Sequence, residues 1–145
     1  MKKILPVFII VILLLLTSCA QNKNPLFDIE EDYYHSSTDL NITTEKENYS
    51  SNDTVIHYTI TNVSDQENAI AGDSHCFTLQ KLVDGKWQRV GTKEEHAWNS
   101  IALILPPNES STRQIELEKY FHLPLEKGTY RIAVEHLLSN TFEIS

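Results

Sequence analysis

Cysteine is almost absent from this chain, because Cys19 and Cys76 are the only two among its 145 residues. A fold that depends on several disulfides is therefore excluded, and a domain built here must rest on its hydrophobic core. Glycine is also scarce, with four residues, so no glycine-rich phosphate loop is available. The chain has twelve basic and twenty acidic residues, which gives a net charge of -8 at pH 7. Such a charge repels phosphate backbones and anionic head groups, and argues against nucleic-acid binding and direct adsorption to a membrane.

The first nineteen residues have the pattern of an export signal. Met1–Lys3 is basic, Ile4–Leu16 is almost unbroken apolar sequence, and Leu16-Thr17-Ser18-Cys19 places two small residues before a cysteine. A transmembrane helix needs about 20 apolar residues, more than this run supplies. A plain secretory signal would leave Cys19 unexplained. The segment resembles the signal-peptidase-II sites of bacterial lipoproteins, and this resemblance implies a diacylglyceryl group, with acyl chains such as palmitate, on Cys19.

The chain is thus predicted to have three parts. Residues 1–18 form a removed signal peptide, residues 19–37 a lipidated cysteine with an acidic tether, and residues 38–145 a folded domain. Fully extended, a tether of this length spans about 60 Å. Two alternatives stay open for its few apolar residues, which either pack on the domain as an added edge element or contact a partner: Phe27, Ile29, Tyr33 and Tyr34.

Beyond residue 38 the apolar pattern has period two, which indicates β-strands. Residues 55–61 place Ile56, Tyr58 and Ile60 on one face, and Asp84-Gly85 between two apolar runs is a strong hairpin signal. Tyr130 follows a glycine at the start of a late strand, as in the tyrosine corner of Greek-key sandwiches. The fold class predicted is all-β, a two-sheet β-sandwich with about seven to nine short antiparallel strands.

Several segments carry a resemblance to a known family, from Leu40 to Ile144. They are Tyr49, Asn62-Val63-Ser64, Lys86-Trp87-Gln88-Arg89-Val90, Pro106-Pro107-Asn108-Glu109-Ser110 and Gly128-Thr129-Tyr130-Arg131. The chain is similar here to bacterial immunoglobulin-like domains found in surface lipoproteins and other exported proteins, which implies an immunoglobulin-like sandwich. Asn108 stands where the family tends to have glycine, and asparagine tolerates the left-handed conformation that the turn requires. The resemblance carries no catalytic residues.

The residues themselves predict no catalytic, cofactor or metal site. His75 and Cys76 are neighbours, so in a strand their side chains face opposite ways and the histidine cannot easily activate the thiol. The six histidines lack the close spacing of a zinc motif, and the acidic loop 65–73 lacks the order of a calcium loop. No nucleophile, base and donor set can be written, so the chain is predicted not to be an enzyme.

The predicted function is that of a noncatalytic cell-envelope lipoprotein, anchored to the cell membrane on its extracytoplasmic face by the lipid on Cys19. Its domain would bind a protein or wall component, or serve a structural role. Trp98 and His96 lie in a long polar loop and are the candidate partner contacts. The alternative is a module that resembles a family of small bacterial β-sandwich proteinase inhibitors. In that case Pro106-Pro107-Asn108 would be the protruding loop.

Overall fold

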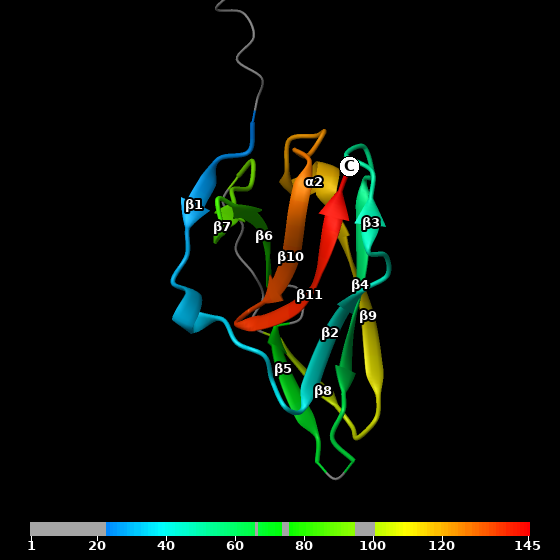
Figure 1. The fold of residues 1–145 in the computed structure, drawn as a ribbon. Coiled ribbons are helices and arrows are strands. Elements are labelled where there is room, and N and C mark those ends of the chain that lie inside the picture. Colours follow the sequence, from blue (N-terminus) through cyan, green and yellow to red (C-terminus); the bar gives the residue numbers. More distant parts are fainter. Residues whose placement is uncertain (1–22, 66, 74–75, 95–100) are drawn as a thin grey trace, which may run out of the picture.

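A computed structural model of the chain describes residues 23–65, 67–73, 76–94 and 101–145 (Figure 1). These residues form eleven β-strands, one α-helical turn, α2 (Leu117–Tyr120), and one 3-10 turn, η1 (Glu31–Tyr33). The strands are β1 (Leu26–Asp28), β2 (Leu40–Thr44), β3 (Asn48–Tyr49), β4 (Val55–Asn62), β5 (Ala69–Asp73), β6 (Phe77–Val83), β7 (Lys86–Val90), β8 (Ala102–Leu105), β9 (Ser110–Glu116), β10 (Gly128–Val134) and β11 (Leu137–Ile144). The all-β fold class predicted from the sequence is confirmed.

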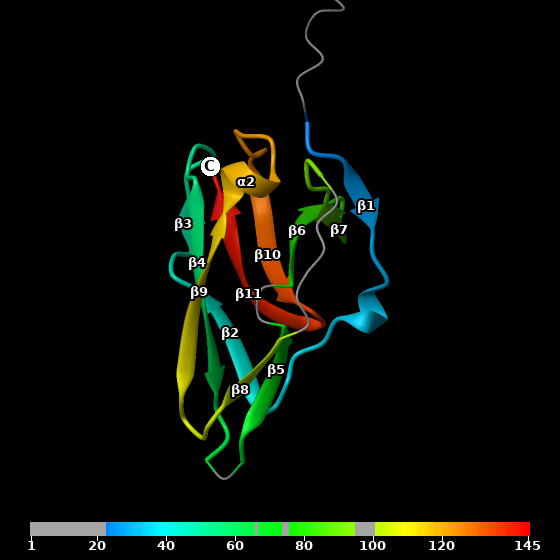
Figure 2. The same cartoon turned by 180° about the vertical axis from the view of Figure 1, so that it is seen from behind.

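The strands are arranged in one long curled sheet and one small ribbon. The long sheet has the order β1-β7-β6-β10-β11-β2-β4-β9, with β3 beside β11, and β5 pairs with β8 separately. Because the long sheet curls between β11 and β2, the strands β4 and β9 face β6 and β10 across the molecule (Figures 1 and 2). Most pairs are antiparallel, whereas β11 pairs in parallel with both β2 and β3. The short strands β1, β3 and β5 add to the strands that the sequence pattern predicts, and β5 lies within the segment 65–73 that the sequence indicates as an acidic loop.

The core lies between these two layers and follows the predicted alternation. In β4 the side chains of Ile56, Tyr58 and Ile60 are buried, and their neighbours Val55, His57, Thr59 and Thr61 are half-buried. Every residue of the core cluster lies between Leu40 and Ile144. A chain that begins after the signal peptide therefore retains the whole core.

Three local predictions are confirmed by the backbone and its hydrogen bonds. Asp84 and Gly85 have φ values of 51° and 78°, the left-handed conformations that a type I′ hairpin requires. Asn108 has φ 60°, so asparagine does occupy the left-handed turn position. The Tyr130 hydroxyl donates to the Glu126 backbone oxygen at 2.6 Å, as a tyrosine corner does.

One segment differs from its prediction. The alternation from Thr112 to Phe121 indicates a single strand, but β9 ends at Glu116 and the helical turn α2 follows. Leu117 and Phe121 are both buried, and the Phe121 amide donates to the Leu117 oxygen at 2.8 Å. A helical turn brings these two side chains together over the end of the core, where a strand would separate them by about 13 Å.

Within the described part of the chain, none of the helices has the length and apolar character that crossing a bilayer demands.

Candidate functional site

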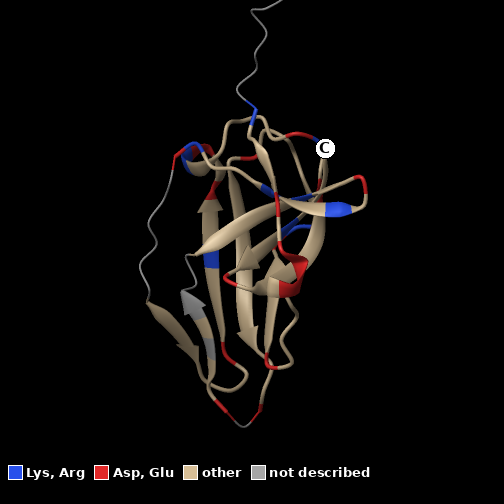
Figure 3. Cartoon of the chain, turned by 90° about the vertical axis from the view of Figure 1, so that its left-hand side faces the viewer, with Lys and Arg blue, Asp and Glu red and all other residues tan. Residues whose placement is uncertain are grey.

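The N-terminal segment, here residues 23–37, lies against the domain and forms part of it. Strand β1 pairs antiparallel with β7, with Leu26 opposite Val90 and Asp28 opposite Gln88. The Gly91 amide also donates to the Pro25 oxygen at 2.7 Å. Figure 3, which views the molecule from this side, shows the segment running over the edge of the sheet. Residues predicted to be a free tether therefore cover the edge of β7, which agrees with the edge-element alternative for Phe27.

Side chains hold both ends of the N-terminal segment. At its start, Lys23 lies 3.1 Å from Glu126, and the Asn24 amide exchanges two hydrogen bonds with the backbone of His122. At its end, His35 forms a β-bridge to Leu137, and its ring stacks on that of His136 with centroids 4.6 Å apart. Attachments at both ends indicate a fixed course for the segment.

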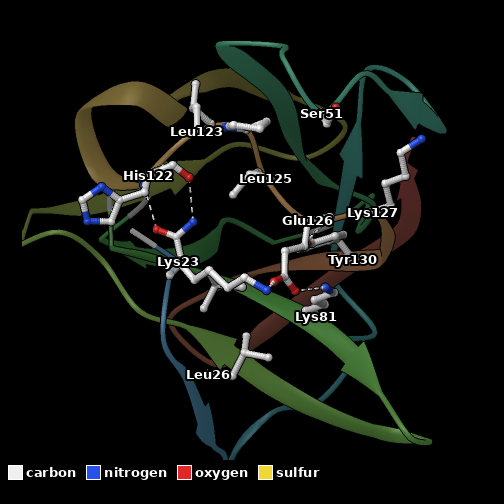
Figure 4. Close-up of a pocket in the computed structure, with 13 residues that line it drawn as sticks. Lys23, Leu26, Ser51, Lys81, His122, Leu123, Leu125, Glu126, Lys127 and Tyr130 are labelled. Carbon is white, nitrogen blue, oxygen red and sulfur yellow. Dashed lines mark hydrogen bonds and ion pairs between the residues drawn. The ribbon is translucent and has the colours of Figure 1, made fainter. Parts of the chain in front are cut away.

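The segment closes one side of a cavity at the end of the sandwich from which it enters (Figure 4). We call this the lysine cavity; its volume is about 680 Å³. The opposite wall is the loop from His122 to Lys127, and the floor is made by the ends of β6, β7 and β10. The lining residues are Lys23, Asn24, Leu26, Ser51, Lys81, Val90, His122, Leu123, Pro124, Leu125, Glu126, Lys127 and Tyr130.

Lys81 is the least expected member of this lining. It lies on the core face of β6, in register with Phe77 and Leu79, and its side chain is only 11% exposed. Its ammonium lies 2.7 Å from Glu126, whose other oxygen meets Lys23. A buried ammonium requires such a partner, because removing an unpaired charge from water costs on the order of several kcal/mol.

The hydrogen bonds from Lys81 and then from Lys23 lower the pKa of Glu126 from its ordinary value of 4.5. The carboxylate is therefore ionised at neutral pH. Burial raises the pKa of the neighbouring Tyr130 hydroxyl, and the negative charge of Glu126 raises it further. Tyr130 consequently acts here as a neutral donor to the loop and not as an acid.

The outer face of β6, β7 and β10 carries a second polar cluster. The Arg131 guanidinium lies 4.1 Å from the centre of the Trp87 ring, and its Nε donates to Gln80 at 2.7 Å. Gln80 is fully buried, and burial lowers the pKa of Arg131. Trp87 is thereby half-buried under Arg131, which makes it a framework residue.

The residues singled out from the sequence are placed as follows. Cys19, His96 and Trp98 lie outside the described residues. Cys76 is half-buried. Among the described residues, no group of three or more His, Cys, Asp or Glu side chains is arranged to hold a metal ion.

The Pro106-Pro107-Asn108 loop is a tight turn. The Glu109 amide donates to the Pro106 oxygen at 3.1 Å, and the Asn108 amide to the Ser64 oxygen at 3.2 Å. These bonds tie the turn to the neighbouring loop after β4.

The lysine cavity was not predicted from the sequence. The one signal that could have indicated it is Lys81, a charged residue at a position where the alternation of β6 requires an apolar one. The partner Glu126 and the covering residue Lys23 are far from it in sequence, so no spacing connects the three.

Comparison with known proteins gives one family and several distant structures. The family model described as a bacterial Ig-like domain matches residues 36–143. No match is found among curated proteins. The similar solved structures include a mutant beta-glucosidase from Listeria innocua in complex with laminaribiose, at 15% identity and a TM-score of 0.39 over 78% of this chain and 17% of the enzyme. The same organism's beta-glucosidase in complex with glucose gives 18% identity and a TM-score of 0.39 over the same shares.

A beta-glucosidase from Kluyveromyces marxianus in complex with glucose gives 12% identity and a TM-score of 0.37, over 73% of this chain and 14% of that one. The chain thus spans less than a fifth of the length of these enzymes. Likeness at this level carries no inference about activity.

Proposed function

The chain belongs to the family of bacterial Ig-like domains, and on that premise we propose that it is a noncatalytic cell-envelope lipoprotein whose domain is a binding or structural module held close to the membrane by a lipid on Cys19. The family accounts for a module without a catalytic site. The proposed lipid determines where that module works, namely the extracytoplasmic face of the cell membrane.

The observation that carries this proposal is the docked N-terminal segment. Lys23 is ion-paired to Glu126 and Asn24 is bonded to His122, so the described contacts with the domain begin at residue 23. Only three residues, 20–22, separate it from Cys19. Whatever conformation they take, four steps of chain reach at most about 14 Å. The domain of the lipidated protein would therefore sit at the bilayer surface, and not at the end of a tether of about 60 Å.

The lipid is tested by replacing its attachment site. In Cys19→Ala, incorporation of labelled palmitate should be lost, and the protein should leave the membrane fraction or accumulate as the uncleaved precursor. Cys76→Ala is the matched control, since it removes the other cysteine and should keep both properties. Normal processing and unchanged membrane retention of Cys19→Ala would refute the anchor.

A partner is sought where the domain is proposed to work. Chemical crosslinking on intact cells, followed by pull-down, should recover membrane proteins or inner-wall components within reach of the bilayer surface. The same experiment with Trp98→Ala tests the candidate contact predicted from the sequence, together with His96→Ala. Equal recovery from both variants would remove that loop from the proposal.

A further inference from the structure

We propose that the lysine cavity binds the phosphate of an anionic lipid headgroup in the membrane to which the protein is anchored. This inference rests on the proposed function for the position of the domain, and on the structure for the chemistry of the site. It differs from the expectation for the whole chain, whose net charge of -8 argues against contact with an anionic surface.

The cavity has more positive than negative charge. Lys23, Lys81 and Lys127 line it, and among the described lining residues Glu126 is the only acidic one. Glu126 is shared by Lys23 and Lys81, and among the described residues Lys127 has no ion pair. Three ammonium groups against one carboxylate leave an excess of two positive charges in the lining, and Figure 4 shows the Lys127 ammonium apart from the Lys23, Glu126 and Lys81 group. Lysine is a common ligand of phosphate in proteins, and a headgroup phosphate carries the charge that is missing here.

The shape of the cavity suits a headgroup attached to a glycerol unit. Its volume of about 680 Å³ lies in the range of pockets that hold small organic molecules. Figure 4 shows Lys23, Glu126 and Lys81 meeting at its centre, with Leu125 and Leu123 on one side and Leu26 on the other. The lysines at the centre could contact a headgroup phosphate, and the leucines around them could contact the apolar part of the lipid next to it.

The distribution of charge over the fold points this cavity toward the membrane. Lys23 and Asn24 line the cavity and are also the first described residues after Cys19 in the sequence. At the opposite end, Asp39, Glu67 and Glu109 all provide backbone oxygens to the segment 62–63, and Figure 3 shows that end red without blue. Figure 3 shows blue and red together at the cavity end, so an anionic bilayer would repel the second end more strongly than the first.

Proximity to the membrane also raises the occupancy of the site. With about 14 Å of chain between anchor and cavity, the headgroups are present at the high effective concentration of a tethered ligand. A site whose binding to vesicles is measurable without the anchor would therefore be largely occupied in the anchored protein.

The test uses the lipid-free chain from Ala20 to Ser145, which retains the whole core, so that binding does not depend on the anchor. Sedimentation with phosphatidylglycerol vesicles should exceed that with phosphatidylcholine vesicles. Lys127→Gln should weaken binding to phosphatidylglycerol about fivefold, the factor expected for one lysine at an anionic surface. The control Lys86→Gln makes the same charge change at an exposed position outside the cavity and should change binding less than twofold.

Glu126→Gln gives a prediction of the opposite sign. Removing the carboxylate that occupies Lys23 and Lys81 should strengthen binding to phosphatidylglycerol by about fivefold or more.

Nonspecific attraction would instead make Lys127→Gln and Lys86→Gln weaken vesicle binding by the same factor, and this result would overturn the proposal. Since Lys127 is exposed, its variant should keep the wild-type unfolding curve, which separates loss of the site from loss of the fold.

Glycerol phosphate in solution separates the lipid from a free phosphate. The lipid proposal predicts that glycerol phosphate at concentrations up to millimolar leaves vesicle binding unchanged, whereas competition anywhere in this range would show a soluble ligand and overturn it. Failure of the headgroup proposal is distinct from failure of the proposed function. Cys19→Ala tests the anchor even when the lipid-free chain does not bind phosphatidylglycerol vesicles.

Discussion

Replacing Gly91 by alanine should release the N-terminal segment from the edge of β7. A Cβ atom added at Gly91 would lie 2.6 Å from Phe27 Cε2 and 2.6 Å from Pro25 Cγ. Both distances are well below van der Waals contact, and both atoms belong to the N-terminal segment. Overfilling a packed site of this kind costs about 1 to 3 kcal/mol. The strain is removed if residues 25–27 leave the sheet edge, while the core keeps its contacts.

The magnitude follows from the strain. If this strain destabilises the docked N-terminal segment by about 1 to 3 kcal/mol, the population with a released segment rises between about fivefold and about 150-fold. The Gly91 amide reports it directly, because it donates to the Pro25 oxygen and loses this partner on release. Hydrogen exchange at residue 91 should therefore accelerate by that factor, whereas amides of β10 should keep their protection.

Two further variants make this result specific. Gly85→Ala lies in the same hairpin and is strained by its φ of 78°, but an added Cβ there has no neighbour within 4 Å. It should lower global stability without accelerating exchange at Gly91. Combining Gly91→Ala with Phe27→Ala and Pro25→Ala removes both colliding atoms and should restore part of the protection. Unchanged exchange at residue 91 in Gly91→Ala would refute the docking of the segment.

Three more predictions concern the residues around the lysine cavity and the turns. Tyr130→Phe removes the donor to the Glu126 oxygen and should lower the free energy of unfolding in urea by about 1 to 2 kcal/mol, and an unchanged midpoint would contradict the tyrosine corner. Glu126 has a pKa below 4.5 in the folded chain, so its ion pairs stabilise the fold above pH 4.5 and this contribution is lost as the pH falls through that lowered pKa. The difference in thermal midpoint between wild type and Glu126→Gln should shrink below pH 4.5, and a difference that is constant with pH would contradict it. Asn108→Ala places at φ 60° a residue that tolerates the left-handed conformation less well than asparagine, and should cost about 1 kcal/mol in urea unfolding, whereas Asn108→Gly should stay near wild type.

The strands and turns could be predicted because their signals are local. The buried set of β4 follows from a two-residue period, and the hairpin at Asp84-Gly85 from residues that tolerate positive φ. Even the tyrosine corner depends on groups only four residues apart, Tyr130 and Glu126. Where the physical cause lies within a few neighbours, the sequence pattern is sufficient.

The docking of the N-terminal segment could not be predicted in the same way. Residues 23–37 are polar and acidic, with exposed side chains at Phe27 and Tyr33, so their composition is that of a tether. Their contacts are backbone hydrogen bonds to β7 and side-chain bonds to His122 and Glu126, about a hundred residues away. A short edge strand held by backbone bonds leaves no apolar period in the sequence.

The lysine cavity lies where the N-terminal segment meets the sandwich domain. Its lining therefore includes residues that lie outside the part of the chain matched by the family. The family match begins at residue 36, after Lys23, Asn24 and Leu26. Lys81 and Glu126 alone would form an ordinary ion pair at the end of a sandwich; Lys23 adds the further charge, and Leu26 the wall. A member of the family with a free tether would lack both. The residues that follow the predicted lipid therefore complete the site that we propose for a lipid headgroup, so that anchoring and recognition involve neighbouring parts of one short segment.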